Sequence, residues 1–384
     1  MSETDLAALR VGETGRKVPL KAPYPYFGGK SRIAALVWAR LGDVRNYVEA
    51  CCGSAAMLLL RPHPPQIETV NDIDCMVANF WRAVQHAADE VVEHVNSPVN
   101  EADLHARHHW LVYSDDALAF RERMKTDPMY YDARIAGWWC WGLCQWIGSG
   151  WCRPQQMQHG DTETGRVGEG VHHVSGSRLE QKRPHLTGNG GGKVGVNSEA
   201  RPQLADAYSR GRGVHGHDAA ETCAARRTWL LDWFGRLRDR LRSVRVCCGD
   251  WSRVCSSQST TTRLGLTGVF LDPPYPTHDA AGNESRDGNL YARGEERGEL
   301  DRLRDAVLAW CREYGPDRQM RIAVCGYDTD GYAALEAEGW EAVAWKTQGG
   351  YANRGKGEGG NANAGRERVW FSPACVRPSG TLFG

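Results

Sequence analysis

Residues 47–60 read YVEACCGSAAMLLL, and this stretch decides the predicted fold. Its first three residues are typical of a short strand that ends in the acid Glu49, Gly53 marks a turn, and the apolar run after it is typical of a helix. Residues 68–72 predict a second strand that ends in an acid, and residues 75–95 predict a long helix. The order strand, helix, strand, helix indicates a doubly wound α/β sheet.

The same pattern returns in the second half of the chain. Strands are predicted at residues 244–248, 268–271, 322–325, 342–345 and 369–371, and helices at residues 226–241, 300–311 and 332–338. The segment between the two halves differs, because residues 118–151 predict Trp-rich helix and residues 148–216 hold 15 Gly among 69 positions.

These patterns predict one α/β domain that is split by an insertion. The domain comprises residues 23–89 and 244–384 and follows a flexible N-terminus at residues 1–22. The insertion comprises residues 90–243 and includes a Gly-rich flexible stretch at about 148–220.

The net charge of the chain is zero, with 47 Lys and Arg against 47 Asp and Glu. This balance excludes a uniformly basic nucleic-acid binder and a strongly acidic solvating protein. The charge is unevenly distributed, because residues 151–245 carry 16 Lys and Arg against 10 Asp and Glu. We therefore expect a polyanion to bind at the insertion.

The 13 Cys are scattered along the chain, and residues 1–20 carry charged side chains without the apolar run of a secretory signal. Apolar stretches elsewhere are too short to span a bilayer. We therefore expect a cytoplasmic protein with reduced thiols and no membrane partner. In such a protein Cys51, Cys247 and Cys325 are predicted to be small buried hydrophobic side chains.

Residues 269–275, which read VFLDPPY, carry the strongest chemical signal. The strand delivers Asp272 to the carboxyl edge of the sheet, where ligands bind in open α/β folds. Pro273 and Pro274 restrict the backbone and leave carbonyls free to face a ligand, and Tyr275 adds an aromatic face. A carboxylate and a carbonyl can accept hydrogen bonds from the two protons of an exocyclic amine on a planar base. A proline-stabilised turn is the alternative interpretation.

Four further motifs accompany this one in a characteristic order. They are Tyr26-Phe27-Gly28-Gly29-Lys30, the strand and turn at residues 47–54, Asn71-Asp72-Ile73-Asp74, and Gly249-Asp250-Trp251. With these motifs, residues 23–79 and 244–373 resemble the Dam-like (alpha-class) adenine-specific DNA N6-methyltransferases of phages and restriction-modification systems. The resemblance implies a Rossmann-like S-adenosylmethionine-dependent methyltransferase sheet with a helical DNA-recognition insertion, in a bacterial cell or phage-infected host.

The residues that the resemblance matches to the cofactor site are Tyr26, Lys30, Glu49, Gly53, Asp72, Asp250 and Trp251. It implies that Tyr26 and Lys30 contact S-adenosylmethionine, Lys30 through the cofactor's carboxylate, and that Glu49 and Gly53 form the pocket for the methionine part. Asp72 would accept hydrogen bonds from the ribose hydroxyls. Asp250 would accept one from the cofactor's adenine amine, and Trp251 would pack on that ring. The alternative for each acid is a strand-end cap or a surface charge.

The residues matched to the target site are Asp272, Pro273, Pro274 and Tyr275, which the resemblance implies hold a flipped adenine of double-stranded DNA. Arg354, Arg366 and Arg368 belong to a late loop and are expected to grip DNA phosphate, with a solvated Gly-rich loop as the alternative. Two positions depart from the family pattern. Cys51 stands where an aromatic residue is usual, and Ala55 stands where a second glycine is usual.

Four residues, Cys140, Cys144, Cys152 and His159, are of the types that bind zinc. Their spacing is not that of two paired zinc knuckles, so buried thiols are the favoured interpretation and no metal is predicted.

A Trp cluster occupies residues 138–151. Helical spacing places Trp138 and Trp141 on one face, and Trp139 and Trp146 on another. A structural role is favoured over stacking on DNA bases.

Together these observations predict a site-specific DNA methyltransferase that transfers a methyl group from S-adenosylmethionine to the N6 amine of adenine, by base flipping and direct in-line transfer. Positioning and fixed dipoles would supply the catalysis without a metal or a covalent intermediate. Two alternatives stay open: cytosine-N4 methylation, which the same amine geometry would serve, and a catalytically weak DNA-binding relative. No obligatory protein partner is evident.

Overall fold

The computed structural model describes residues 20–26, 29–98, 101–146, 151–152, 223–276, 278–280, 282, 298–345 and 366–377. Within these ranges the strands are β1 (Asn46–Glu49), β2 (Ile67–Asp72), β3 (Arg245–Cys248), β4 (Thr267–Leu271), β5 (Met320–Tyr327), β6 (Glu341–Ala344) and β7 (Glu367–Phe371). The α-helices are α2 (Ala34–Leu41), α3 (Ala56–Leu59), α4 (Cys75–Val95), α5 (Glu101–Tyr113), α6 (Asp115–Thr126), α7 (Ala133–Leu143), α9 (Cys223–Leu241), α10 (Ser252–Cys255) and α11 (Glu299–Tyr314). Short 3₁₀ helices are η1 (Lys30–Arg32), η4 (Thr262–Leu264) and η6 (Tyr332–Glu338).

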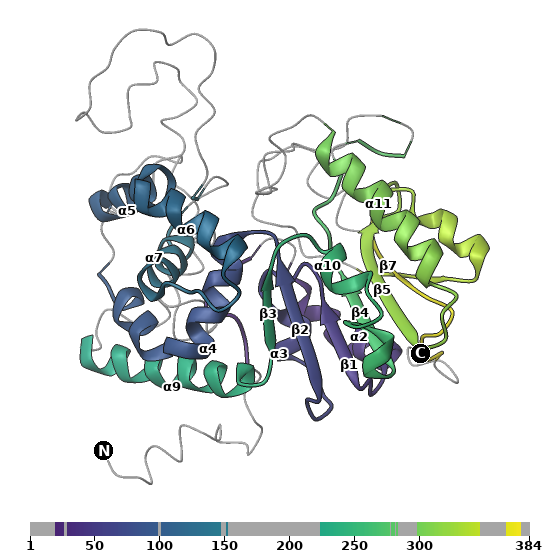
Figure 1. The fold of residues 1–384 in the computed structure, drawn as a ribbon, viewed down its shortest axis with the longest axis horizontal. Coiled ribbons are helices and arrows are strands. Elements are labelled where there is room, and N and C mark those ends of the chain that lie inside the picture. Colours follow the sequence, from purple (N-terminus) through teal and green to yellow (C-terminus); the bar gives the residue numbers. More distant parts are fainter. Residues whose placement is uncertain are drawn as a thin grey trace, which may run out of the picture.

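The described strands form one seven-stranded sheet in the order β3-β2-β1-β4-β5-β7-β6 (Figure 1). Strands β1 to β5 pair in parallel, whereas β7 runs antiparallel to both β5 and β6. The chain moves from β1 outward through β2 to β3 and then returns to the other side of β1 with β4. This confirms the predicted α/β class, and the mixed sheet is compatible with a Rossmann-like fold.

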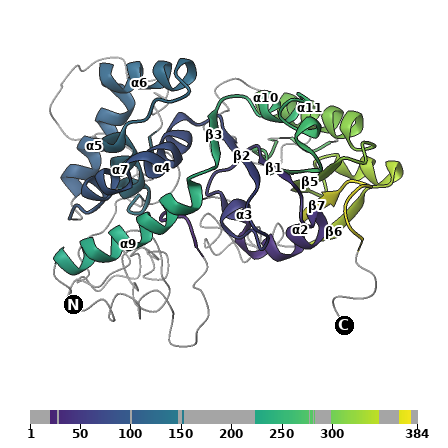
Figure 2. The same cartoon turned by 60° about the horizontal axis from the view of Figure 1, so that its bottom comes forward.

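The sheet is buried on both faces because its strands alternate between two cores. Tyr47 and Phe270 point into the core that includes α2 and α3, whereas their neighbours Val48 and Val269 point into the core that includes α10 and α11. Successive side chains of a strand face opposite sides, so a sheet covered by helices on both faces needs apolar residues at nearly every position. Figures 1 and 2 show the two helical layers with the sheet between them.

A group of helices, α4 to α7 together with α9, stands beside the β3 edge of the sheet (Figure 2). Helix α4 leaves the end of β2, where the Asp74 carboxylate accepts a hydrogen bond from Met76 N at 2.8 Å and caps the helix. It then packs against both α7 and α9. The boundary predicted at residue 90 falls inside α4, just beyond Ala87, where a non-helical backbone (φ −142°, ψ 45°) kinks the helix.

The prediction of continuous helix over residues 118–151 is wrong in one respect, because the helix is broken at residues 127–132. The break contains Pro128, and Asp132 restarts the helix by accepting a hydrogen bond from Ile135 N at 2.8 Å.

Residues 332–338 form a 3₁₀ rather than an α-helix, between two glycines at positive φ, Gly331 and Gly339. The predicted Gly-rich stretch lies outside the described residues except for 151–152, as does the N-terminus up to residue 19.

The Trp cluster is largely internal. Trp139 and Trp141 are buried and Trp138 is half-buried. Trp138 and Trp141 share a helix face as predicted, since the Arg107 guanidinium lies 5.2 Å from one ring centroid and 4.1 Å from the other. Trp146 lies beyond the end of α7 and stacks on the imidazole ring of His108. The prediction that Trp146 shares a helix face with Trp139 is therefore wrong. None of the described helices has the length and apolar character that crossing a membrane requires.

A buried ionic cluster fastens α9 to the sheet. The Glu68 carboxylate at the start of β2 is almost fully buried and accepts hydrogen bonds from Arg240 at 2.6 and 2.8 Å and from Arg61 at 3.1 Å. The Arg61 guanidinium also lies 5.2 Å from the ring centroid of Trp38. One carboxylate therefore balances two guanidinium groups at the junction of helix and sheet.

Removing that carboxylate should destabilise the protein strongly. Glu68→Ala leaves two guanidinium groups without their shared acid, and we expect the free energy of unfolding in urea to fall by about 3–5 kcal/mol. Glu122→Ala, which removes the exposed partner of Lys125, is the matched control and should change it by less than about 0.5 kcal/mol. Equal losses in the two variants would contradict this assignment.

Candidate ligand site at the carboxyl edge of the sheet

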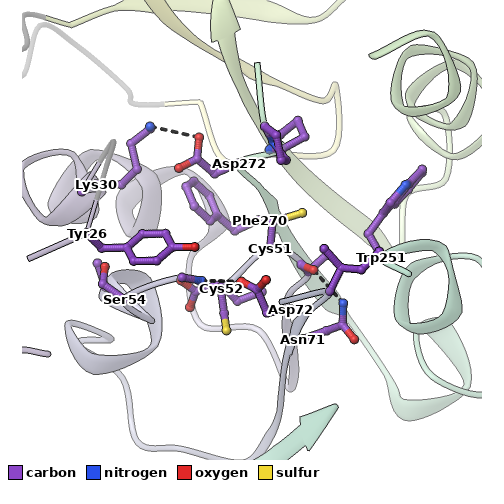
Figure 3. Close-up of a pocket in the computed structure, with 18 of the residues that line it drawn as sticks. Tyr26, Lys30, Cys51, Cys52, Ser54, Asn71, Asp72, Trp251, Phe270 and Asp272 are labelled. Carbon is purple, nitrogen blue, oxygen red and sulfur yellow. Dashed lines mark hydrogen bonds and ion pairs between the residues drawn. The ribbon is translucent and has the colours of Figure 1, made fainter. Parts of the chain in front are cut away.

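A cavity opens where the carboxyl ends of the central parallel strands meet, at the place where the strand order reverses between β1 and β4. It holds roughly 840 Å³ of space including its open mouth, which is the size of a small-molecule site. Ten of the eleven residues predicted for the cofactor and target sites line it: Tyr26, Lys30, Glu49, Gly53, Asp72, Trp251, Asp272, Pro273, Pro274 and Tyr275. Figure 3 shows Tyr26 and Lys30 on one side of the cavity and Trp251 on the other.

Asp72, the last residue of β2, organises the floor of the cavity. Its two carboxylate oxygens accept hydrogen bonds from Gly53 N and Asp74 N, both at 2.9 Å. Burial raises the pKa of Asp72 to about 7, with a further contribution from Asp74, while the backbone hydrogen bonds oppose the rise. The carboxylate therefore changes protonation near neutral pH.

Gly53 has a left-handed backbone conformation and no space for a side chain. Its φ is +45°, and a Cβ there would lie 2.3 Å from Cε1 of Tyr26. Its carbonyl accepts hydrogen bonds from Tyr24 Oη at 3.0 Å and from Trp81 Nε1 at 2.9 Å. The turn is thus clamped between the N-terminal segment and α4, with the Tyr26 ring lying directly on the backbone.

Ala55, where the resembled family usually has glycine, has a φ of +49° and is fully buried. A left-handed backbone favours glycine, which explains why the resembled family usually has glycine at this position. Here Ala55, the residue that precedes α3, adopts the left-handed conformation.

Glu49, the last residue of β1, is buried with its Oε2 held by Leu58 N at 2.9 Å and Tyr47 Oη at 3.2 Å. Burial raises the pKa of Glu49 to about 8, although these hydrogen bonds lower it, and Asp272 raises it further. The group is therefore largely protonated at neutral pH until a ligand supplies positive charge.

Lys30 also lines the cavity, and its ammonium pairs with Asp272 Oδ1 at 2.9 Å (Figure 3). Burial alone would lower the pKa of Lys30, but Asp272, Cys325 and Glu367 raise it above its usual value. Burial also raises the pKa of Asp272, and the Lys30 charge opposes that rise. The ion pair therefore favours the ionised form of the carboxylate that follows β4.

Aromatic rings surround this ion pair. The Lys30 ammonium lies 5.3 Å from the ring centroid of Tyr275 and 5.7 Å from that of Trp345, and Glu367 Oε2 is 4.0 Å away. Neither Trp345 nor Glu367 was expected at the site. Glu367 begins β7, and only the antiparallel direction of that strand brings its first residue to this edge.

Asp250 does not line the cavity. Its Oδ1 accepts hydrogen bonds from Ser252 N at 3.0 Å and Ser252 Oγ at 2.6 Å and caps the start of α10. This arrangement is the strand-end cap given above as the alternative to a contact with the cofactor. Its neighbour Trp251 does line the cavity and packs edge-to-face on Trp310 at 5.8 Å.

Residues without a predicted ligand role also line the cavity, among them Asn71 and Cys51. Asn71 Nδ2 donates hydrogen bonds to Ala50 O and Gly249 O, both at 2.9 Å, and so ties the ends of β1 and β3 to β2. Asn71 stands beside Asp72 in the motif at residues 71–74, and this position is the sequence signal that marks it. Cys51 is only partly buried because it faces the cavity, and Cys247 is also partly exposed, whereas Cys325 is buried as predicted.

The arginines expected to contact DNA phosphate are engaged within the protein where they are described. Arg366 Nε lies 3.1 Å and Arg368 Nη2 3.7 Å from the carboxylate of Asp328. Arg354 lies outside the described residues. Within residues 151–245, Arg227 contacts Glu93 and Arg240 contacts Glu68.

The charge of the cavity restricts its ligand. Three carboxylic acids line it, and Lys30 is the only lysine or arginine among the described lining residues. Glycine-rich dinucleotide sites present a long helix N-terminus to phosphate, but here the helix after the turn, α3, has four residues. The arrangement favours a ligand with a positive charge, hydroxyl and amine donors, and no phosphate. No group of three or more His, Cys, Asp or Glu side chains is placed to hold a metal ion in the described part of the chain.

No known protein family model matches the chain, and no curated protein matches it in a sequence search.

Gly53→Ala should lower the free energy of unfolding by about 1–3 kcal/mol through the clash with Tyr26, and by about 1–2 kcal/mol more through the left-handed backbone. Adding Tyr26→Ala should remove the first contribution and leave the second. Urea unfolding of the two single variants and the double variant measures both. A double variant no more stable than Gly53→Ala would show that the ring is not the obstacle.

Glu49 and Asp72 should make stability fall with rising pH. Their folded-state pKa values of about 8 and about 7 exceed the roughly 4.3 and 3.9 of unfolded chains, so between these limits the folded protein binds more protons. The free energy of unfolding should therefore decrease from about pH 6.5 to about pH 8.5. Burial lowers the pKa of His108 to about 4, which keeps this histidine neutral throughout the window.

Urea unfolding at both pH values measures this decrease, and Glu49→Gln should reduce it. The exposed variant Glu122→Gln is the control and should retain the full decrease. An unchanged pH dependence in Glu49→Gln would refute the raised pKa.

Proposed function

We propose that this protein is an S-adenosylmethionine-dependent DNA methyltransferase that modifies the N6 amine of adenine. The observation that carries the proposal is the lysine-paired Asp272 followed by two prolines and Tyr275 in the cavity that also contains Glu49 and Asp72. The same cavity thus offers acceptors for an amine and a separate acidic region for a cationic cofactor.

The residues present fit S-adenosylmethionine, which carries a sulfonium, an ammonium, hydroxyl groups and an adenine, and no phosphate. Glu49 and Asp72 offer buried acceptors whose raised pKa values would fall beside a cation. Tyr26 and Trp251 provide aromatic surfaces on opposite sides of the cavity (Figure 3). When bound, the cofactor supplies an electrophilic methyl group.

The chain's own residues would prepare the attacking amine. Asp272, kept ionised by Lys30, and the Pro273 carbonyl accept the two amine protons and stabilise the positive charge that develops on the nitrogen. Tyr275 offers a stacking surface worth about 1–3 kcal/mol, which offsets part of the cost of flipping the base from the duplex. After transfer the nitrogen loses a proton, for which Asp272 is the nearest proposed acceptor.

A labelled-methyl transfer assay on unmethylated double-stranded DNA, followed by digestion to nucleosides, tests the proposal. We expect N6-methyladenine from the wild-type protein. N4-methylcytosine would select cytosine methylation instead, and the absence of any labelled nucleoside together with DNA binding would select a non-catalytic binder.

Asp272→Ala should reduce transfer by at least about 100-fold, because the amine loses its charged acceptor, while S-adenosylhomocysteine still binds in calorimetry. Asp272→Asn keeps the side-chain volume and serves as the second variant if the alanine variant unfolds. Arg312→Ala, at an exposed ion pair with Glu338, is the control and should keep full activity. Undiminished transfer by both Asp272 variants would disprove the catalytic assignment.

A further inference from the structure

Two cysteines meet behind the cavity, at the junction of the sheet and the helical group. The sulfur atoms of Cys75, the first residue of α4, and Cys248, the last residue of β3, are 3.8 Å apart. Cys248 is also the cross-strand partner of Asp72, whose carboxylate shapes the cavity floor. The pair therefore joins two elements that both lead directly into the candidate site.

The two thiols are chemically unequal. The Cys248 thiol donates a hydrogen bond to the Cys75 sulfur, and this bond lowers the pKa of Cys75. Burial and Asp74 oppose that shift in the pKa, Lys125 and Arg121 support it, and the Cys75 thiol itself donates to Arg121 O at 3.9 Å. The same contact, together with burial, raises the pKa of Cys248. Cys75 also occupies the first turn of a 21-residue helix, where the helix dipole favours a thiolate. Cys75 is partly exposed and Cys248 is buried, so a reagent reaches Cys75 first.

Other close thiols in the described part of the chain lack this combination. Cys140 and Cys144 lie one turn apart on α7, but both are buried and both point at the Pro23 carbonyl, at 3.9 and 3.4 Å. Burial raises the pKa of Cys140, which keeps it protonated and unreactive.

We propose that Cys75 and Cys248 form a redox-active dithiol that hydrogen peroxide oxidises to a disulfide. The Cys75 thiolate attacks one peroxide oxygen, the O–O bond breaks, and the chain carries a sulfenic acid while hydroxide leaves, as water after protonation. Cys248 then attacks the sulfenic sulfur, an S–S bond forms, and water leaves with the Cys248 proton. The two thiols lose two electrons and the peroxide gains them. A dithiol reductant reverses the change.

The bond would also alter the cavity. A disulfide needs its sulfurs about 2.05 Å apart, so they must approach by about 1.8 Å. Cys248 is followed by Gly249, whose N–H donates to Asp72 O and whose carbonyl accepts from Asn71 Nδ2, both at 2.9 Å. Pulling β3 toward α4 strains these two bonds and shifts the floor of the site. This consequence for cofactor binding rests on the proposed function, whereas formation of the disulfide does not.

Mass analysis of the full-length protein tests the dithiol. After brief exposure to hydrogen peroxide and alkylation of the remaining thiols, peptide mapping should show Cys75 joined to Cys248, and dithiothreitol should restore both thiols. Cys248→Ser should instead accumulate a sulfenic acid on Cys75 that dimedone traps. Cys247→Ser, which changes the adjacent and partly exposed thiol, is the matched control and should still form the bond.

Recovery of Cys75 as a free thiol in oxidised wild-type protein would overturn the proposal, as would a Cys75 disulfide to any other residue. The wild-type result does not depend on the folding of any variant.

Calorimetry with S-adenosylhomocysteine tests the coupling. The oxidised protein should bind at least about fivefold more weakly than the reduced protein, and Cys248→Ser should show no such difference after peroxide. Equal affinity of the two wild-type forms would overturn the coupling. If neither form binds while the disulfide forms, the proposed function fails and the dithiol stands.

Discussion

The hydrogen bonds of the Asp72 carboxylate hold the site together, because they join the turn after β1 to the end of β2 and the start of α4. One oxygen fixes the turn at Gly53 and the other fixes Asp74, which in turn caps α4. The end of β1, the end of β2 and the start of the helical group are thereby placed relative to one buried acid. That acid is costly to ionise where it lies, and its pKa of about 7 reflects the balance between desolvation and backbone donors.

The same balance explains which ligand the cavity suits. Glu49 and Asp72 are poised to ionise when a positive charge arrives, whereas Asp272 already has Lys30 as its counter-ion. Two acidic regions of one cavity are thus prepared for different tasks: one for a cationic molecule, the other for a neutral amine. A phosphate-bearing ligand would find three carboxylic acids and one engaged lysine.

The helical group shows where local patterns are sufficient and where they are not. The bounds of the helix over residues 75–95 could be predicted, because its apolar periodicity is strong and Asp74 is a good cap, but its kink at Ala87 was not predicted. The interruption between α6 and α7 was missed although Pro128 and Asp132 signal it. A local count of charges also does not reveal that Arg227 and Arg240 of the basic stretch pair with acids from other elements, Glu93 and Glu68.

The sequence by itself determined the strands, their apolar faces and the acids at their ends. These features depend on residues that are neighbours along the chain, and parallel strands bring their carboxyl ends to one edge. Only the tertiary structure decided that Lys30 pairs with Asp272, that Glu367 joins them, and that Asp250 caps α10 instead of lining the cavity. It likewise decided that Cys75 and Cys248, which are 173 positions apart, touch. The physical reason is that such contacts follow from strand order and from the reversed direction of β7, which are set by packing between distant segments and leave no local periodicity in the sequence.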